Sequence, residues 1–176
     1  EVARVRAQLE KRGVAPGDRV GLLGPNSARW AAIDLAIVAH GAICVPLYAR
    51  QDPKQLAGML RDCEACLLLA SEAALADAIG PHLPAGCQLA LYDELFADEA
   101  RSADEPNLKP EEPLTIIYTS GTSGEPKGAL LSARNVDYML AVTVERIARM
   151  TKSERSEDRV FHYLPFCFAG SRIMLW

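Results

Sequence analysis

The stretch YTSGTSGEPKG, from Tyr118 to Gly128, combines hydroxyl side chains, glycines and a single lysine between two apolar segments. Glycine lets a backbone turn sharply and approach a ligand closely, and consecutive N–H groups in such a turn form an anion-binding nest. The hydroxyls add hydrogen-bond donors, and Lys127 adds a positive charge on a flexible stem. The stretch therefore predicts a polyphosphate-binding loop, with these nucleotide-binding candidates: Thr119, Ser120, Gly121, Thr122, Ser123, Gly124 and Lys127.

Two common nucleotide-binding patterns do not fit this stretch. The Walker pattern needs a glycine before the lysine and a hydroxyl after it, whereas Pro126 precedes Lys127 here and Gly128 follows it. The dinucleotide pattern G-x-G-x-x-G is also absent. An alternative interpretation is that the stretch is a solvent-exposed hairpin loop that binds no ligand, since Gly, Ser and Thr are typical turn residues.

The whole chain has the composition of a globular protein. Of its 176 residues, 49% are hydrophobic and 24% charged, and the formal net charge is −4. This charge gives no sign of nucleic acid as a partner. No apolar run approaches the length of a membrane span, and the charged segment 1–12 does not resemble a signal peptide. Nothing in the sequence indicates an oligomeric state.

The cysteines indicate a reducing compartment. The sequence contains five cysteines at irregular spacing. The odd number and the irregular spacing argue against a disulfide framework and favour a cytoplasmic protein. Cys63 and Cys66 form a C-x-x-C pair, which can be redox-active or bind zinc. A zinc site needs a second pair of ligands at suitable spacing, and the sequence shows none, so we interpret the pair as structural and expect no metal site built from protein ligands.

The first half of the chain alternates between helical and strand patterns. Strands are predicted at 19–23, 42–47, 65–70 and 87–91. Helices are predicted at 2–12, from Asn26 or Ser27 to Gly41, from Asp52-Pro53, and in a short alanine-rich segment capped by Ser71. This alternation predicts an α/β fold, in which a doubly wound parallel sheet is covered by flanking helices.

The second half divides at an acidic, proline-containing segment. Residues 93–113 predict a short helix and an exposed linker. Residues 114–118 and 128–131 predict strands that enter and leave the phosphate loop. Ser132 caps a long predicted helix, a charged loop follows at 151–158, and a further strand is expected at 160–164. We therefore divide the chain into an α/β subdomain (1–97), a linker (98–113) and a segment with the phosphate loop, a helix and a further motif (114–176).

Taken together, these motifs resemble those of the adenylate-forming (AMP-binding) superfamily, which includes acyl-CoA synthetases, luciferases and peptide-synthetase adenylation domains. Residues 119–128 satisfy the family signature [ST]-[ST]-G-[ST]-[ST]-G-x-P-K-G at every position. Segments 17–20, 26–30 and 41–47 resemble the opening of the large domain of acyl-CoA synthetases. The resemblance is greatest to long-chain fatty acid–CoA ligases. It covers only the first part of the large N-terminal domain, because the later family motifs would lie beyond Trp176.

Residues 164–172 are similar to the next family motif, which often reads L-P-L-x-H-x-x-x-R in fatty acyl-CoA ligases. Phe168 stands where many members carry histidine, and the resemblance implies that it lies beside the carboxylate and the acyl-adenylate. A phenylalanine offers an apolar wall there but no hydrogen bond. The alternative is that Phe166 and Phe168 are ordinary core residues. Arg172 is expected either to pair with an acid or phosphate or to lie at the surface.

The resemblance implies a two-step reaction. A carboxylate attacks the α-phosphate of ATP to give an acyl-adenylate and pyrophosphate, and the thiol of coenzyme A then takes the acyl group. The loop, with Lys127 as its catalytic residue, would stabilise charge on the leaving pyrophosphate. Mg²⁺ would bridge the phosphates, although the stretch 118–128 offers no evident carboxylate ligand apart from Glu125, which we expect to face solvent.

Two alternatives stay open. The acyl acceptor can be a carrier protein, as for a fatty acyl–AMP ligase or an adenylation domain. The 176 residues on their own are expected to be catalytically silent, binding phosphate weakly at most. A long-chain substrate would favour loose, peripheral contact with a membrane, while the identity and chain length of the acid stay undetermined.

Overall fold

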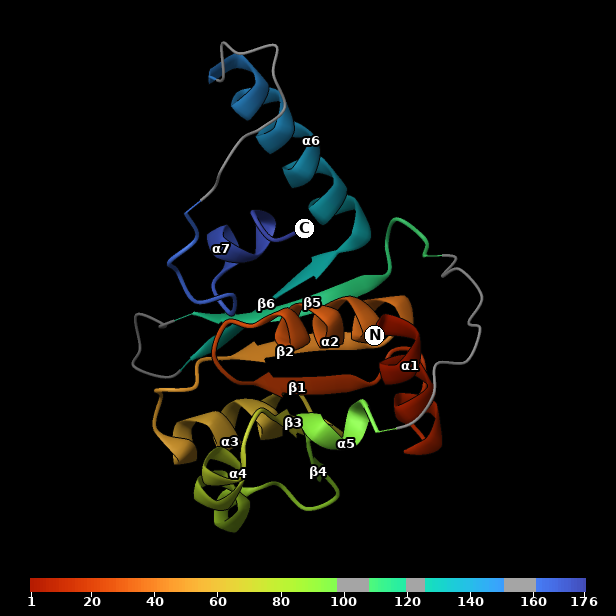
Figure 1. Ribbon diagram of the computed structural model, residues 1–176, viewed down its shortest axis with the longest axis vertical. Coiled ribbons are helices and arrows are strands. Elements are labelled where there is room, and N and C mark those ends of the chain that lie inside the picture. Colours follow the sequence, from red (N-terminus) through yellow and green to blue (C-terminus); the bar gives the residue numbers. More distant parts are fainter. Residues whose placement is uncertain (98–107, 120–125, 151–160) are drawn as a thin grey trace.

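The computed structural model describes residues 1–97, 108–119, 126–150 and 161–176. Its centre is a six-stranded sheet with the strand order β4-β3-β1-β2-β5-β6 (Figure 1). In chain order the elements are α1 (Val2–Lys11), β1 (Arg19–Leu23), α2 (Ala28–Ala39), β2 (Ile43–Leu47), α3 (Pro53–Asp62), β3 (Leu67–Ala70), α4 (Ala73–Ile79), a 3₁₀ turn (Gly80–His82), β4 (Gln88–Leu91), α5 (Tyr92–Leu95), β5 (Pro113–Thr119), β6 (Lys127–Ser132), α6 (Ala133–Met150) and α7 (Ala169–Ile173).

The central strands are buried on both faces of the sheet. All the residues of β2 and β3, and all of β1 except Arg19, are buried. Strands covered on both sides read as continuous apolar runs, which is why their positions follow closely from the sequence. At Gly21 a Cβ would lie 2.7 Å from Leu60 Cδ2 and 2.9 Å from Leu68 Cδ1. Glycine there lets α3 pack close to the sheet.

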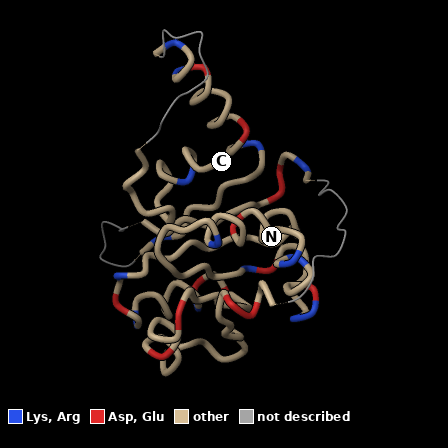
Figure 2. Tube along the Cα trace, viewed as in Figure 1, with Lys and Arg blue, Asp and Glu red and all other residues tan. Residues whose placement is uncertain are grey.

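Helices cover the two faces of the sheet in separate layers. On one face α1, α2 and α5 enclose a cluster that includes Leu9, Trp30 and Leu22. On the other face α3 and α4 enclose a cluster that includes Leu60, Leu68 and Leu47. Charged residues of both signs are interspersed along the described segments (Figure 2). The doubly wound arrangement predicted from the sequence is confirmed for β1 to β5, which pair in parallel.

The sheet is mixed rather than wholly parallel, because β6 runs antiparallel to β5. The prediction of a parallel sheet is therefore wrong at this edge. The physical reason is the short connection: residues 120–126 can close a hairpin, whereas a parallel pairing needs a crossover of about a dozen residues or more. The phosphate-loop stretch thus connects two hydrogen-bonded neighbours.

Side-chain caps begin two of the helices where the sequence predicted them. The hydroxyl of Ser27 accepts a hydrogen bond from Trp30 N at 3.0 Å, and the carboxylate of Asp52 accepts from the backbone N–H groups of Lys54 and Gln55. The prediction that Ser71 caps α4 is wrong, since Glu72 is the N-cap residue. Ser71 instead continues the strand ladder, donating its N–H to Leu23 O at 2.9 Å, and α4 begins one residue later.

Beyond the hairpin the chain forms α6 and the short α7. Ser132 and Asn135 cap α6 reciprocally, because Ser132 N donates to Asn135 Oδ1 at 3.0 Å and Asn135 N donates to Ser132 Oγ at 3.4 Å. The described part of the predicted strand 160–164 is not a strand. Pro165 lacks an N–H for a ladder, and a turn from Phe168 N to Pro165 O leads into α7, a helix that the sequence analysis missed. The charged loop expected at 151–158 lies outside the described residues.

Candidate functional site

The candidate phosphate loop is closed by the β5–β6 hairpin. Thr119 ends β5 and Lys127 begins β6, and the two residues are direct partners in the antiparallel register. Both are exposed. A hydroxyl and an ammonium group therefore face solvent at the mouth of the loop, as a site for an anionic ligand requires. The other predicted loop residues, Ser120, Gly121, Thr122, Ser123 and Gly124, as well as Glu125, lie outside the described residues.

This mouth lies at the carboxyl edge of the sheet. Strand β5 runs parallel to β2 and next to it, so the carboxyl ends of both strands lie on the same edge. Thr119 is the last residue of β5, and Tyr48 directly follows β2. In open α/β sheets ligands bind in the crevice at the carboxyl ends of the strands. The position of the loop thus agrees with a ligand-binding role.

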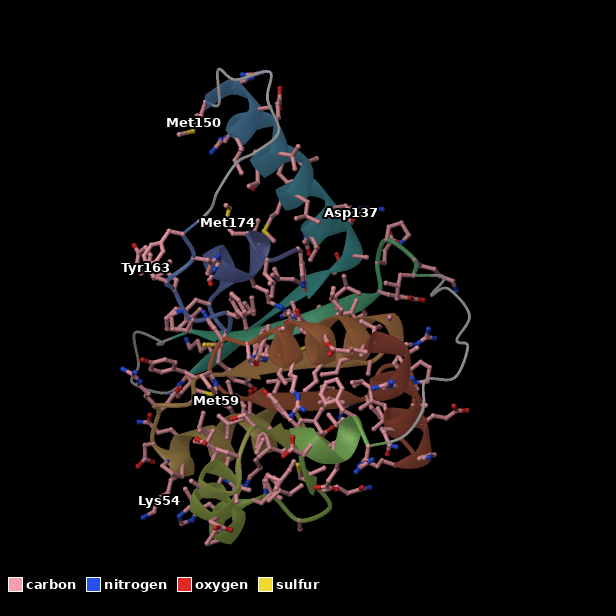
Figure 3. All side chains as sticks on the ribbon, viewed as in Figure 1. Lys54, Met59, Asp137, Met150, Tyr163 and Met174 are labelled. Atoms are coloured by element: carbon pink, nitrogen blue, oxygen red, sulfur yellow. The ribbon has the colours of Figure 1, made fainter. Side chains whose placement is uncertain are left out.

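A cavity of about 350 Å³ opens at the same edge, beyond β1 and β2. Its lining includes Gly24, Asn26 and Tyr48 from the strand ends and Tyr163 from the segment before α7. Tyr163 is labelled in Figure 3. Phe168 packs against Tyr48 with ring centroids 5.5 Å apart, and it is 45% exposed. It is therefore not an ordinary core residue but an apolar surface next to this cavity.

Asn26 fixes the segment that carries Phe168. Its amide nitrogen donates to Leu164 O at 2.8 Å, and its side-chain oxygen accepts from Phe166 N at 2.7 Å. The ring of Phe166 packs against Trp30 at 5.5 Å between centroids. These contacts join the turn after β1 to a segment far along the chain. Phe166, unlike Phe168, is in contact with the core.

A buried ion pair anchors α7. Arg172 donates to both carboxylate oxygens of Asp34 on α2, and both side chains are almost fully buried, at 2% and 0% exposure. Arg172 also donates to the Thr115 hydroxyl on β5. Its guanidinium stacks on Trp176, with Cζ 4.4 Å from the ring centroid. The indole nitrogen of Trp176 donates to Asp34 at 2.8 Å. Of the two expectations for Arg172, pairing with an acid is confirmed and a surface position is wrong.

Sequence reasoning missed Asn26, Tyr48 and Asp34 as residues of this region. For Asp34 a signal was present, because it is the only ionic residue in the apolar run from Trp30 to Val38. A carboxylate on the buried face of a helix needs a partner. For Asn26 and Tyr48 the partners lie more than a hundred residues away, and no local pattern indicates such contacts.

The cysteines are free thiols in buried or half-buried positions. Among the described residues, no group of three or more His, Cys, Asp or Glu side chains could bind a metal ion. Burial raises the pKa of the Cys87 and Cys167 thiols from 9.0 to about 11. Both stay neutral in the folded protein near neutral pH, which agrees with a structural role.

These thiols predict a loss of stability at alkaline pH. Above pH 9 the thiols ionise in the unfolded chain but not in the folded one, so the unfolded state gains stability as pH rises towards 11. We expect each thiol to cost on the order of 1 kcal/mol of unfolding free energy at pH 10. Urea unfolding at pH 8 and pH 10 measures it, and the double variant Cys87→Ala/Cys167→Ala should depend less on pH. An equal loss in that variant would contradict the assignment.

Comparison with known proteins identifies the family. The chain matches the AMP-binding enzyme family over residues 1–176, and it belongs to this family. It is 34% identical over 143 residues to the long-chain-fatty-acid–CoA ligase FadD15 of Mycobacterium bovis, a match that covers 70% of this chain and 24% of that protein. It is 35% identical over 133 residues to tyrocidine synthase 3 of Brevibacillus parabrevis, covering 76% of this chain and 2% of that protein.

Solved structures agree with the fold. The structure of a Mycobacterium tuberculosis fatty acyl CoA synthetase superposes with a TM-score of 0.86 at 24% identity, covering 99% of this chain and 35% of that one. The sheet with its flanking helices therefore matches the N-terminal domain of acyl-CoA synthetases. The chain spans about a quarter of the length of FadD15. None of the helices in the described segments is long and apolar enough to cross a membrane.

Proposed function

We propose that the protein activates a carboxylic acid, in particular a fatty acid, with ATP and transfers the acyl group to coenzyme A. The observation that supports this most is the placement of two predicted motifs on one edge of the sheet. The mouth of the phosphate loop, at Thr119 and Lys127, and the aromatic surface of Phe168 on Tyr48 both lie beyond the carboxyl ends of neighbouring strands. Such an arrangement suits the joining of an acid to a nucleotide phosphate.

In this proposal residues 1–97 form the supporting α/β layer, and residues 114–176 carry the phosphate loop and the acyl-site motif. Lys127 and the hydroxyl of Thr119 contact the β- and γ-phosphates of ATP, and Lys127 stabilises the charge that moves onto pyrophosphate when the carboxylate attacks the α-phosphate. The rest of the loop, Ser120 to Gly124, supplies further N–H and hydroxyl donors. Phe168 forms an apolar wall beside the acid.

Mg²⁺ is expected to enter with the nucleotide. Oxygen ligands from phosphates and water are typical of Mg²⁺ bound with ATP, and the described side chains form no metal cluster of their own. We therefore assign the ion to the phosphates and assign no step to a protein-bound metal.

The experiment that tests the function is ATP–pyrophosphate exchange by the full-length protein with a panel of carboxylic acids. We expect exchange that depends on the acid and is strongest with fatty acids. Exchange with no dependence on any acid would contradict the proposal. Adding coenzyme A or a phosphopantetheine-bearing carrier protein then identifies the acceptor. The carrier is a second candidate because of the 35% identity to tyrocidine synthase 3.

Replacing Phe168 tests the acid side of the site. In Phe168→Ala the wall next to Tyr48 is lost, so we expect the KM for the acid to rise by about fivefold while the KM for ATP changes little, as a lost apolar contact of roughly 1 kcal/mol predicts. Exchange kinetics at varied acid and at varied ATP measure both constants. Tyr138→Ala is the control, since Tyr138 is an aromatic residue on α6 that is 72% exposed. A rise in the KM for ATP of the same size would contradict this role.

A further inference from the structure

The hydroxyl of Tyr118 joins the phosphate-loop hairpin to helix α3. It donates to Asp62 Oδ2 at 2.6 Å and also lies 3.0 Å from the backbone oxygen of Met59. Both acceptors belong to the last turn of α3, while Tyr118 directly precedes Thr119. Burial raises the pKa of this phenol, and the hydrogen bond to Asp62 raises it further. The hydroxyl therefore remains a donor at neutral pH.

The ring of Tyr118 also contacts the opposite strand of the hairpin. Tyr118 and Gly128 are partners in the β5–β6 register. A Cβ added at Gly128 would lie 3.2 Å from the Cζ atom of the Tyr118 ring and 2.8 Å from Ile116 Cγ2. The ring thus packs directly over the backbone of Gly128, and a cross-strand aromatic ring on glycine is a known way to stabilise a hairpin. Gly128 follows Lys127, so the ring contacts the backbone next to the lysine.

Packing alone does not fix this ring. A cavity of about 490 Å³ lies between α3 and the hairpin, and Tyr118 and Asp62 are part of its lining, together with Lys54, Met59 and Pro126. Lys54 and Met59 are labelled on α3 in Figure 3. A half-buried side chain next to open space can change its rotamer at low cost. The hydrogen bonds to α3 therefore add a restraint to the packing of the ring on Gly128 and on the neighbouring core cluster.

We propose that Tyr118 and Asp62 are positioning residues for the phosphate loop. We call their contact, together with the bond to Met59 O, the Tyr118–Asp62 anchor. It connects α3 to the first strand of the hairpin by hydrogen bonds and to the second strand by the ring on Gly128. It thereby sets the orientation of Thr119 and Lys127 towards the phosphates. The inference rests on the proposed function, since it assigns these residues to the same site.

The test compares variants that remove one component of the anchor each. Tyr118→Phe keeps the ring but loses the hydroxyl, and Asp62→Ala removes the acceptor. In exchange assays on the full-length protein we expect both to raise the KM for ATP by about three- to tenfold. The KM for the acid should stay within about twofold. The double variant should be no worse than Tyr118→Phe alone, because that substitution already removes the hydroxyl that contacts both Asp62 and Met59 O. Asp62→Asn, which still accepts from the hydroxyl, should restore most of the affinity.

Tyr138→Phe is the matched control, since Tyr138 is 72% exposed on α6. Equal increases in the KM for ATP and for the acid, or no increase in the KM for ATP, would overturn the inference. Binding of inorganic pyrophosphate, measured by calorimetry, separates it from the proposed function. A protein without exchange activity that binds pyrophosphate more weakly after Tyr118→Phe would refute the ligase but support the anchor. Equal pyrophosphate binding by the wild-type protein and by Tyr118→Phe would overturn the inference.

Discussion

Replacing Lys127 by alanine is expected to slow acid-dependent ATP–pyrophosphate exchange by more than about tenfold, because preorganised charge at a leaving group is among the largest contributions to catalysis. Lys127 is exposed at the first position of β6, opposite Thr119. An exposed side chain with no core contact can be shortened without unfolding the protein. The loss should therefore appear in kcat and in the KM for ATP, with little change in thermal stability.

Two control variants give this result its meaning. Lys109→Ala removes an ammonium group elsewhere in the chain and should leave exchange unchanged, which excludes a general effect of net charge. Lys127→Arg keeps the charge but changes its geometry, and we expect partial activity, since a planar guanidinium does not substitute fully for a compact ammonium group. Wild-type exchange rates in Lys127→Ala would remove Lys127 from the mechanism.

Breaking the buried ion pair should have the largest effect on stability. Arg172→Ala leaves the carboxylate of Asp34 fully buried with its main partner lost, and a lone buried charge of this kind costs about 3–5 kcal/mol. Asp34→Ala should cost a similar amount, because the guanidinium then lacks its counter-charge. Urea unfolding measures both. Since α7 begins just after Phe168, we also expect the KM for the acid to rise before the protein unfolds.

The comparison that tests this account uses an exposed pair. Arg134 and Glu111 also form an ion pair, but each side chain is 69% exposed, so Arg134→Ala should cost less than about 1 kcal/mol. The apolar double variant Asp34→Leu/Arg172→Met should regain much of the stability, because no charge is then left buried. If Arg172→Ala destabilised the protein no more than Arg134→Ala, the buried pair would not be the anchor of α7.

The sequence predicts those parts of the fold that depend on local patterns. Strand β1 has the predicted bounds, 19–23, because its apolar run is buried on both faces. Ser27, one of the two candidates for the cap of α2, and Asp52 cap their helices as predicted, since short polar side chains accept hydrogen bonds from the unpaired N–H groups of a first helical turn. The long α6 was predicted from its 3.6-residue period, although Val144 and Met150 on that helix are exposed.

Three kinds of feature were not predicted: the direction of the edge strand β6, the short helix α7, and contacts between residues far apart in the chain. The antiparallel direction of β6 follows from the length of its connection, which the sequence does contain, but the pattern of alternating elements favoured a parallel sheet. Helix α7 is too short for a helical period to be visible. The Asn26 contacts and the Asp34–Arg172 pair join residues about 140 positions apart, and only the fold brings them together.

The same division holds for the candidate site. The signature at 119–128 predicts the chemistry of the loop, and the register of Thr119 and Lys127 agrees with a common ligand. It does not indicate that α3 contacts Tyr118 on β5 through Asp62, since an aspartate at a helix end has many possible roles. The motif thus names candidate ligand-binding residues, whose role stays a prediction, whereas it carries no signal of the contact between Tyr118 and α3.

The most direct test of the central claim follows the oxygen atoms of the acid. When a carboxylate labelled with ¹⁸O attacks the α-phosphate of ATP and the acyl group then passes to a thiol, the carbon–oxygen bond breaks and one labelled oxygen stays on AMP. Mass spectrometry of the products from the full-length protein, ATP, labelled fatty acid and coenzyme A measures this transfer. We predict one ¹⁸O atom in AMP for each thioester formed. Label in inorganic phosphate, with ADP as the nucleotide product, would contradict an adenylate-forming ligase.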